Sequence, residues 1–143
     1  MQDRFKFRVF ISDKKNSKNS LTGMFKVHSL HTGTNKAIIT SLYGNCSIKL
    51  ENNILMQCTG LKDKNGKLIY EGDIIKYMYY NPKRYTKWVV VFDQNTLEFG
   101  LKDYGYGGYL RITRNSILNN KVEIIGNKFQ NPELLNEVEN DNK

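Results

Sequence analysis

The sequence predicts an all-β protein, and three observations support this fold class. Short segments alternate apolar and polar residues with a period of two, which is the pattern of a strand with one buried face. Aromatic residues, which favour strands, are abundant among the 143 residues: nine Tyr, seven Phe and one Trp. Turn-forming pairs such as Asn65-Gly66 separate the segments, whereas the two prolines are too few to end most of them.

Residues 1–60 are predicted to form an N-terminal β subdomain. Its first strand, 4–11, places Phe7, Val9 and Ile11 on one face. The polar segment 12–20 that follows is rich in Asp, Asn and Ser and is typical of a solvated loop. Further strands are expected at 22–30, 37–43, 46–50 and 54–58.

Residues 61–135 are predicted to form a second unit, an SH3-like β-barrel. The barrel begins at Glu71-Gly72-Asp73, because Gly72 permits a sharp bend and Asp73 can accept hydrogen bonds from nearby backbone N–H groups. The run WVVVFD at 88–93 is the most β-prone in the chain and is expected to be a central strand. Other strands are expected at 68–70, 74–80, 97–101, 110–112 and 121–125.

A short C-terminal helix is expected to close this barrel. Asn131 fits the N-cap position, Pro132 fits the first helical position, and Glu133 lies near the positive end of the helix dipole. Leu134 and Leu135 are expected to dock the helix on the barrel. The remaining residues, 136–143, are predicted to be a frayed acidic tail.

The charge and composition restrict the compartment more than the function. The formal net charge is +8, which permits attraction to a polyanion. However, 17 Lys and 17 Asn against five Arg is also the skew of an AT-rich genome, and Arg is the preferred residue for bidentate recognition. No apolar run approaches the roughly 18–20 residues that cross a membrane. We therefore expect a cytoplasmic protein with free thiols at Cys46 and Cys58 and no membrane partner.

Three blocks of the sequence resemble the YopX-like family of phage and prophage proteins. They are RFKFRVF at 4–10, MQCTGLKDKNGKLIYEGDIIKY at 56–77 and VEIIGNKFQNPELL at 122–135. The segments 17–55 and 81–120 carry no such resemblance. In order and spacing the blocks span nearly the whole chain. The resemblance implies a mostly-β architecture and a phage or prophage source in a low-GC bacterium, and it implies no activity.

A metal site is not expected. His28 and His31 lie three residues apart, but the strand predicted at 22–30 contains only the first of them. Zinc sites favour close cysteine pairs, whereas Cys46 and Cys58 are separated by a long gap. Two surface histidines and two packed thiols account for these residues, and the sequence predicts no metal and no cofactor.

Catalysis is not expected either. Glu71 and Asp73 form the kind of acid pair that hydrolases use, but turn formation explains both residues. The glycine-rich segment 105–108 lacks the strand-to-helix context of a phosphate-binding loop. No nucleophile-elbow motif is present, so the sequence predicts a protein that is not an enzyme.

Two aromatic-basic loops, 79–88 and 104–114, make nucleic-acid binding a possible function. Aromatic rings stack on bases while Lys and Arg contact phosphates. The alternative is that the tyrosines pack in the sheet and the lysines solvate its edge. The candidate binding residues are Tyr80, Lys83, Arg84, Tyr85, Lys87, Trp88, Tyr106, Tyr109 and Arg111.

Contact with another protein, or self-association, is the function that the sequence favours. Exposed tyrosines, a glycine-rich loop and β edges all suit protein contacts. The main prediction is a non-catalytic protein-interaction or assembly module of a phage or prophage. Nucleic-acid binding through the two aromatic-basic loops is the alternative.

Overall fold

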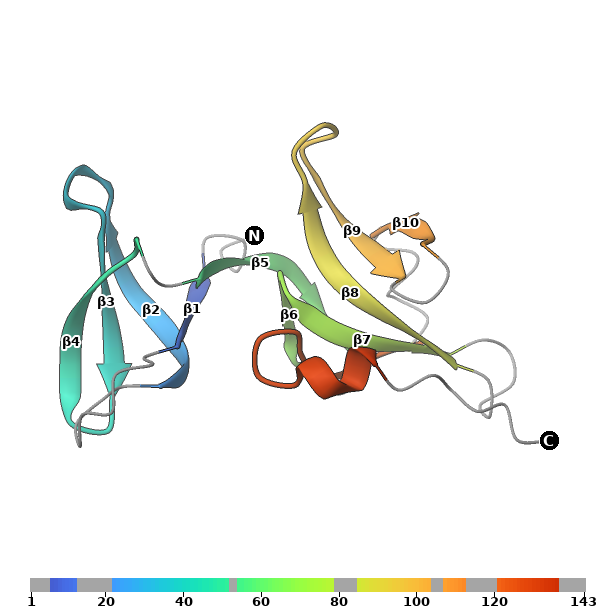
Figure 1. Cartoon of the computed structure of the whole chain (residues 1–143), viewed down its shortest axis with the longest axis horizontal. Helices are drawn as coiled ribbons and strands as arrows, with labels where there is room; N and C mark the ends of the chain where they lie inside the picture. Colours follow the sequence, from blue (N-terminus) through green and yellow to red (C-terminus); the bar gives the residue numbers. More distant parts are fainter. Residues whose placement is uncertain are drawn as a thin grey trace. The chain divides into compact units, whose positions relative to one another are not determined.

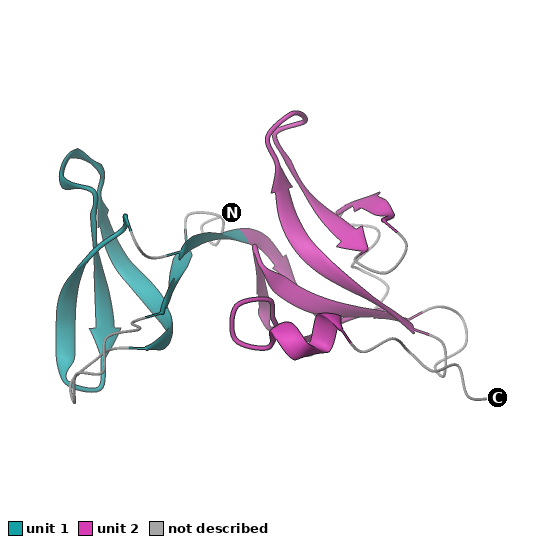
Figure 2. Ribbon diagram, in the orientation of Figure 1, with its two compact units in different colours: residues 1–58 teal, residues 59–143 magenta. Residues whose placement is uncertain are grey.

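The computed structural model describes residues 6–12, 22–51, 54–78, 85–103, 107–112 and 121–136 (Figure 1). These residues form antiparallel sheets joined by turns, which confirms the all-β class. The chain divides into two compact units, residues 1–58 and residues 59–143 (Figure 2). The predicted acidic tail lies outside the described residues, apart from Asn136.

The first unit is an antiparallel sheet whose core is small and apolar. Val9, Ile11 and Ile39 form the buried centre, as the period-two pattern predicted for the first strand. The strand expected at 37–43 ends at Ser41, because Gly44 takes a φ of 107° and the chain reverses there. The strands, in the order β4-β3-β2-β1-β5, are β1 (Phe7–Ile11), β2 (Gly23–His31), β3 (Lys36–Ser41), β4 (Gly44–Lys49) and the first part of β5 (Ile54–Lys62).

The second unit contains the end of β5, the short strand β6 (Leu68–Tyr70) beside it, and a five-stranded sheet in the order β10-β9-β8-β7-β11. The strand expected to be central, β8, is in the middle of this sheet. The hydrophobic core of the second unit consists of Ile69, Ile75, Trp88, Val90, Leu101 and Val122. The five strands are β7 (Asp73–Met78), β8 (Tyr85–Asp93), β9 (Glu98–Asp103), β10 (Tyr109–Arg111) and β11 (Val122–Asn127).

The prediction of a closed barrel over 61–135 is wrong. In the part of the chain that the structure describes, β10 and β11 are the two edges of an open sheet and do not pair. The physical reason lies at β11, whose outer backbone groups are already occupied. The N–H of Lys64 donates to the carbonyl of Val122, and the N–H of Ile124 donates to the Asp63 carboxylate.

The expected C-terminal helix is a single 3-10 turn, η3 (Pro132–Leu135). Pro132 and Glu133 occupy the predicted positions, but the Asn131 side chain does not cap the turn. Instead its Oδ1 accepts a hydrogen bond from the N–H of Asn127 at 3.2 Å. The Asn131 amide thus ties η3 to the end of β11 rather than to its own first turn.

Gly126 permits this close approach. A β-bulge lies between Ile124 and Gly126, and an added Cβ at Gly126 would come within 2.7 Å of Leu134 Cδ1 and 2.8 Å of Asn131 Oδ1. The φ of Gly126 is not in the left-handed region, so the constraint is one of space. Leu134 therefore docks η3 as the sequence predicted, through a contact that requires glycine.

Replacing Gly126 with alanine is expected to destabilise the second unit by about 1–3 kcal/mol, the usual cost of overpacking. The free energy of unfolding from denaturant titration measures this. Gly33→Ala is the matched control, because nothing lies within 4 Å of an added Cβ there. If Leu134→Ala does not recover part of the loss in the double variant, the proposed steric cause is wrong.

Candidate functional site

The turn-forming stretch 61–77 is a structural element built around two buried carboxylates, those of Asp63 and Asp73. Asp63 Oδ1 accepts hydrogen bonds from the N–H groups of Asn65 and Lys67, both at 2.9 Å, and its Oδ2 accepts one from Ile124 at 3.1 Å. Gly66 takes the positive φ, 78°, that the predicted Asn-Gly turn needs. The stretch therefore organises the backbone and presents no free carboxylate at Asp63.

Asp73 has the same role at the next turn. Its Oδ2 accepts a hydrogen bond from the N–H of Tyr70 at 2.8 Å, and Oδ1 lies 3.5 Å from the Asn127 amide nitrogen. Asp73 is 1% exposed and Asn127 is 3% exposed. The prediction that Asp73 serves as a backbone acceptor is confirmed, and Gly72 takes a φ of 82° at the bend.

One surface ion pair accompanies these turns. The Lys64 ammonium lies 2.6 Å from the Glu123 carboxylate, and both side chains are partly exposed. The hydrogen bond from Lys64 holds the pKa of Glu123 below its ordinary value. Any stability from this pair is therefore present above the ordinary pKa of Glu and is lost as the pH falls through the lowered one. Solvent screening keeps the contribution small.

The predicted residues at the start of β8 lie on two opposite faces of the sheet. Tyr85 and Lys87 share one face because alternate residues of a strand point the same way. The Lys76 ammonium lies 3.8 Å from the centre of the Tyr85 ring, and Lys87 Nζ donates to the carbonyl of Leu134 at 3.3 Å. Trp88 points to the other face, where it joins the core.

The predicted residues of β10 lie on the same face as Tyr85. Val89 of β8 pairs with Lys102, and Lys102 pairs with Tyr109, so this face continues from β8 across β9 to Tyr109 and Arg111. The Tyr109 ring occupies the space that a side chain at position 100 would fill, above Gly100. We call the surface made by Lys76, Tyr85, Lys87, Lys102, Tyr109 and Arg111 the aromatic-basic face.

The remaining candidate residues, Tyr80, Lys83, Arg84 and Tyr106, lie outside the described residues. Trp88 is 6% exposed, and its indole Nε1 donates to Thr86 Oγ1 at 2.6 Å. Its ring also lies beside Gly108. Of the two predicted aromatic-basic loops, the structure thus brings Tyr85, Lys87, Tyr109 and Arg111 together on one face and assigns Trp88 to packing.

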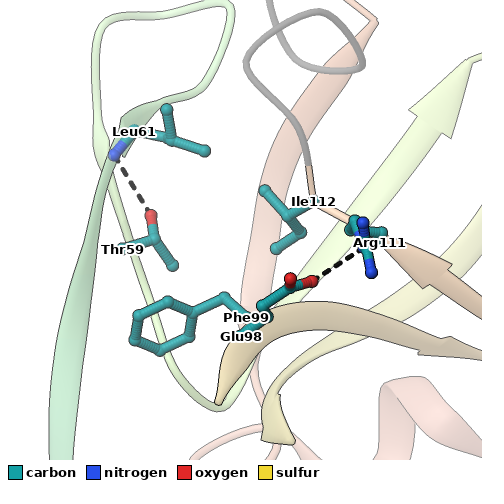
Figure 3. Close-up of a pocket in the computed structure, with 6 residues that line it drawn as sticks. All are labelled: Thr59, Leu61, Glu98, Phe99, Arg111 and Ile112. Atoms are coloured by element: carbon teal, nitrogen blue, oxygen red, sulfur yellow. Dashed lines mark hydrogen bonds and ion pairs between the residues drawn. The ribbon is translucent and has the colours of Figure 1, made fainter. Parts of the chain in front are cut away.

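An open pocket of about 290 Å³ lies beside β10 in the second unit (Figure 3). Arg111 Nε lies 2.7 Å from Glu98 Oε2, and the two side chains form an ion pair. Thr59 Oγ1 donates to the Ile69 carbonyl and accepts from the N–H of Leu61, so its hydroxyl is already engaged. The lining residues are Thr59, Leu61, Glu98, Phe99, Arg111 and Ile112, none of which forms a nucleophile–base pair.

Among the described residues, the most exposed large apolar side chains belong to the turn between β3 and β4, which the sequence did not single out. Leu42 is 100% exposed and Tyr43 is 92% exposed. Ser41 Oγ accepts from the N–H of Tyr43 at 3.2 Å and donates to the carbonyl of Gly44 at 2.9 Å. This hairpin tip is therefore hydrogen-bonded within itself while its two large side chains point into solvent. Polar residues usually occupy such turns, so the presence of Leu42 and Tyr43 in one is the sequence signal that could have identified this site.

The described residues provide neither a metal-ligating cluster nor a membrane span. Within these ranges no group of three or more His, Cys, Asp or Glu side chains is arranged to hold a metal ion. Cys46 and Cys58 are not joined by a disulfide. The helical segments in the same ranges are too short and too polar to cross a bilayer.

Fold and site together define a class: an all-β protein of two sheet units whose distinctive polar residues support turns. The model of the YopX protein family matches residues 6–136, so the chain belongs to the YopX family. A comparison with curated proteins found no match.

Two crystal structures have a similar fold. Protein EF1440 from Enterococcus faecalis is 23% identical with a TM-score of 0.51, covering 91% of this chain and 96% of that one. YopX from Bacillus subtilis is 19% identical with a TM-score of 0.54, covering 95% and 99% respectively. At these identities the similarity concerns the fold.

Proposed function

We propose that this protein is a non-catalytic protein-interaction module of a phage or prophage, acting in the cytoplasm of its bacterial host. The hairpin tip Leu42-Tyr43 is its main contact with a partner protein. The observation that carries this proposal is the exposure of two adjacent large apolar side chains on an internally hydrogen-bonded turn. The preformed turn lowers the ordering cost of binding. Burying each side chain contributes about 1.5–3 kcal/mol.

A capture experiment tests this function. The purified chain is immobilised and exposed to a lysate of cells that naturally produce it. Any captured protein is then purified and its Kd for the chain measured. We expect Leu42→Ser combined with Tyr43→Ser to weaken this Kd at least about tenfold, because the loss of both anchors together costs more than about 1.4 kcal/mol.

Leu97→Ser is the control, because Leu97 is a 74% exposed apolar residue in the turn between β8 and β9. It should leave the Kd unchanged. An unchanged Kd in the Leu42→Ser/Tyr43→Ser variant would show that the hairpin tip is not the contact. Failure to recover any directly binding protein would count against the proposed function itself.

Single-stranded nucleic-acid binding is a second candidate, and the aromatic-basic face is the specific observation that favours it. Two tyrosines and four cationic side chains share this face. The cations of this face already have partners within the chain, among them Lys76 on the Tyr85 ring, Lys87 on the Leu134 carbonyl, and Arg111 on Glu98. These contacts make nucleic-acid binding by this face a weaker candidate than protein binding by the hairpin tip.

A salt titration tests the second candidate with labelled single- and double-stranded nucleic acid. Binding that weakens steeply with salt in the wild type, and is lost in Tyr85→Ala/Lys102→Ala, would support it. Tyr43→Ala/Lys36→Ala is the matched control, since it removes one aromatic and one cationic residue from the first unit. If the wild type bound no nucleic acid at low salt, nucleic-acid binding would be excluded as its function. Trp88 is unsuitable as a probe because it lies in the core.

A further inference from the structure

The two edges of the five-stranded sheet, β11 and β10, differ in whether their outward backbone groups have hydrogen-bond partners among the described residues. At β11 the turn at 63–64 occupies the outward backbone groups: Lys64 N–H donates to the Val122 carbonyl at 2.9 Å, and Asp63 accepts from the Ile124 N–H. Capping of this kind prevents an edge from pairing with another chain. The β10 edge has no equivalent cap among the described residues.

The register shows which groups of β10 face outward. The carbonyl of Gly108 and the N–H of Ile112 both bond to β9, at 2.8 and 3.3 Å. Backbone groups alternate in direction along an antiparallel strand, so Leu110 also faces β9 while Tyr109 and Arg111 face away. No described residue bonds to the outward N–H and carbonyl groups of Tyr109 and Arg111. All three residues of β10 are exposed.

We propose that a second copy of this chain pairs with β10, antiparallel and centred on Leu110. In this arrangement the two outward residues of one strand meet those of the other, so Tyr109 lies directly opposite Arg111 in both directions. The two-fold symmetry makes the patch complementary to itself. Each opposed pair exchanges two backbone hydrogen bonds, and the two Leu110 residues form the closer, non-hydrogen-bonded pair.

The side chains suit this self-pairing. A guanidinium opposite a tyrosine ring is a favourable cross-strand pair. Within one chain both side chains also contact β9: Arg111 forms its 2.7 Å ion pair with Glu98, and the Tyr109 ring lies over Gly100. Leu110, 42% exposed, contributes the apolar contact. A strand of three residues buries little surface, so the association is weak and depends on concentration.

The edge of the other sheet does not offer the same match. Its outer strand, β4, carries Asn45, Ser47 and Lys49 at the positions whose backbone faces away from β3. Self-pairing centred on Ser47 would place Asn45 opposite Lys49 and bring no apolar or aromatic contact. Charged and polar side chains at an edge discourage pairing. The β10 proposal does not depend on the hairpin tip Leu42-Tyr43.

Cysteine cross-linking in the full chain tests the pairing directly. Opposed residues of a non-hydrogen-bonded pair have Cα atoms about 4.5 Å apart, close enough for a disulfide. We expect Leu110→Cys to form a disulfide dimer under mild oxidation. Leu97→Cys, at a more exposed position, should remain monomeric. Equal cross-linking at both positions, or none at Leu110, would overturn the proposal.

Mass measurement gives the second test without a new thiol. Sedimentation equilibrium should show the mass of the wild type rising from 16.7 kDa toward twice that value with concentration. Arg111→Pro removes an outward N–H and should abolish the rise, whereas Arg111→Ala keeps that N–H and should only weaken it. Ser47→Pro, at the β4 edge, should not affect the mass. A monomer at every concentration, or an equal loss in Ser47→Pro, would overturn the proposal.

Discussion

Replacing Trp88 with alanine is expected to destabilise the protein by about 3–5 kcal/mol, the cost of removing a buried tryptophan. Trp88 is 6% exposed and packs with Ile75 and Val90 in the core of the second unit. The substitution also leaves the Thr86 hydroxyl without the indole N–H that lies 2.6 Å away. A loss of this size is a large share of the roughly 5–15 kcal/mol that holds a domain folded.

Thermal and denaturant unfolding measure this loss. Tyr43→Ala is the matched control, because it removes an aromatic residue that is 92% exposed and should change stability by no more than about 0.5 kcal/mol. Trp88→Phe should lose less than Trp88→Ala, since it keeps most of the apolar volume. If Trp88→Ala retained full stability and lost only ligand binding, the assignment of Trp88 to the core would be wrong.

Replacing Asp63 with alanine is expected to cost about 2–4 kcal/mol. Three backbone N–H groups, those of Asn65, Lys67 and Ile124, lose their acceptor together. One hydrogen bond to a charged group has a net value of about 1.5–3 kcal/mol, and the total stays near this value because water can replace the carboxylate at the turn once the side chain is removed. The bond to Ile124 also joins β11 to the turn. We therefore expect a loss of cooperative unfolding in the second unit as well as a lower free energy of unfolding.

Asp93→Ala provides the control for this substitution. Asp93 accepts the same kind of bond from the N–H two residues ahead, that of Asn95 at 2.8 Å, but in an exposed turn. Its loss should cost about 0.5–1.5 kcal/mol, the value of a single hydrogen bond. Asp63→Asn keeps one carbonyl oxygen and should lose less than Asp63→Ala. Equal effects for Asp63→Ala and Asp93→Ala would contradict the structural role given to Asp63.

Two of the blocks that carry the family resemblance meet in the folded second unit. Asp63 in the block at 56–77 accepts the N–H of Ile124 in the block at 122–135. The Gly72 carbonyl in the first accepts the N–H of Lys128 in the second, at 2.9 Å. The sequence pattern shared with the YopX family thus corresponds to a set of turn and bulge contacts. This explains why the pattern predicts a fold and implies no chemistry.

Local patterns were sufficient for much of the fold. The alternation around Val9 placed the first strand and its buried face, because the period of a strand is fixed by backbone geometry. The turns at Gly66 and Gly72 were predictable because few residues other than glycine adopt a positive φ easily. The run at 88–93 forms part of the central strand β8, as expected from its β-branched and aromatic residues, which favour strands.

The candidate site was less predictable, because neighbouring residues in a strand point in opposite directions. Tyr85, Lys87 and Trp88 belong to one aromatic-basic cluster in the sequence, yet the sheet separates Trp88 from the other two. Cross-strand register alone placed Tyr109 on the same face as Tyr85. Register is set by long-range pairing, which no local pattern encodes.

The all-β class and the main turns could be read from the sequence, because propensity, period and turn chemistry are properties of short segments. The resemblance to the YopX family came from three blocks of sequence and not from these patterns. Only the folded chain shows that the second sheet is open rather than closed, that Asp63 caps the β11 edge, and that Leu42 and Tyr43 are exposed to solvent. These features depend on contacts between segments far apart in the chain. The exposed hairpin tip, and a β10 edge that no described residue caps, are therefore visible only in the folded protein.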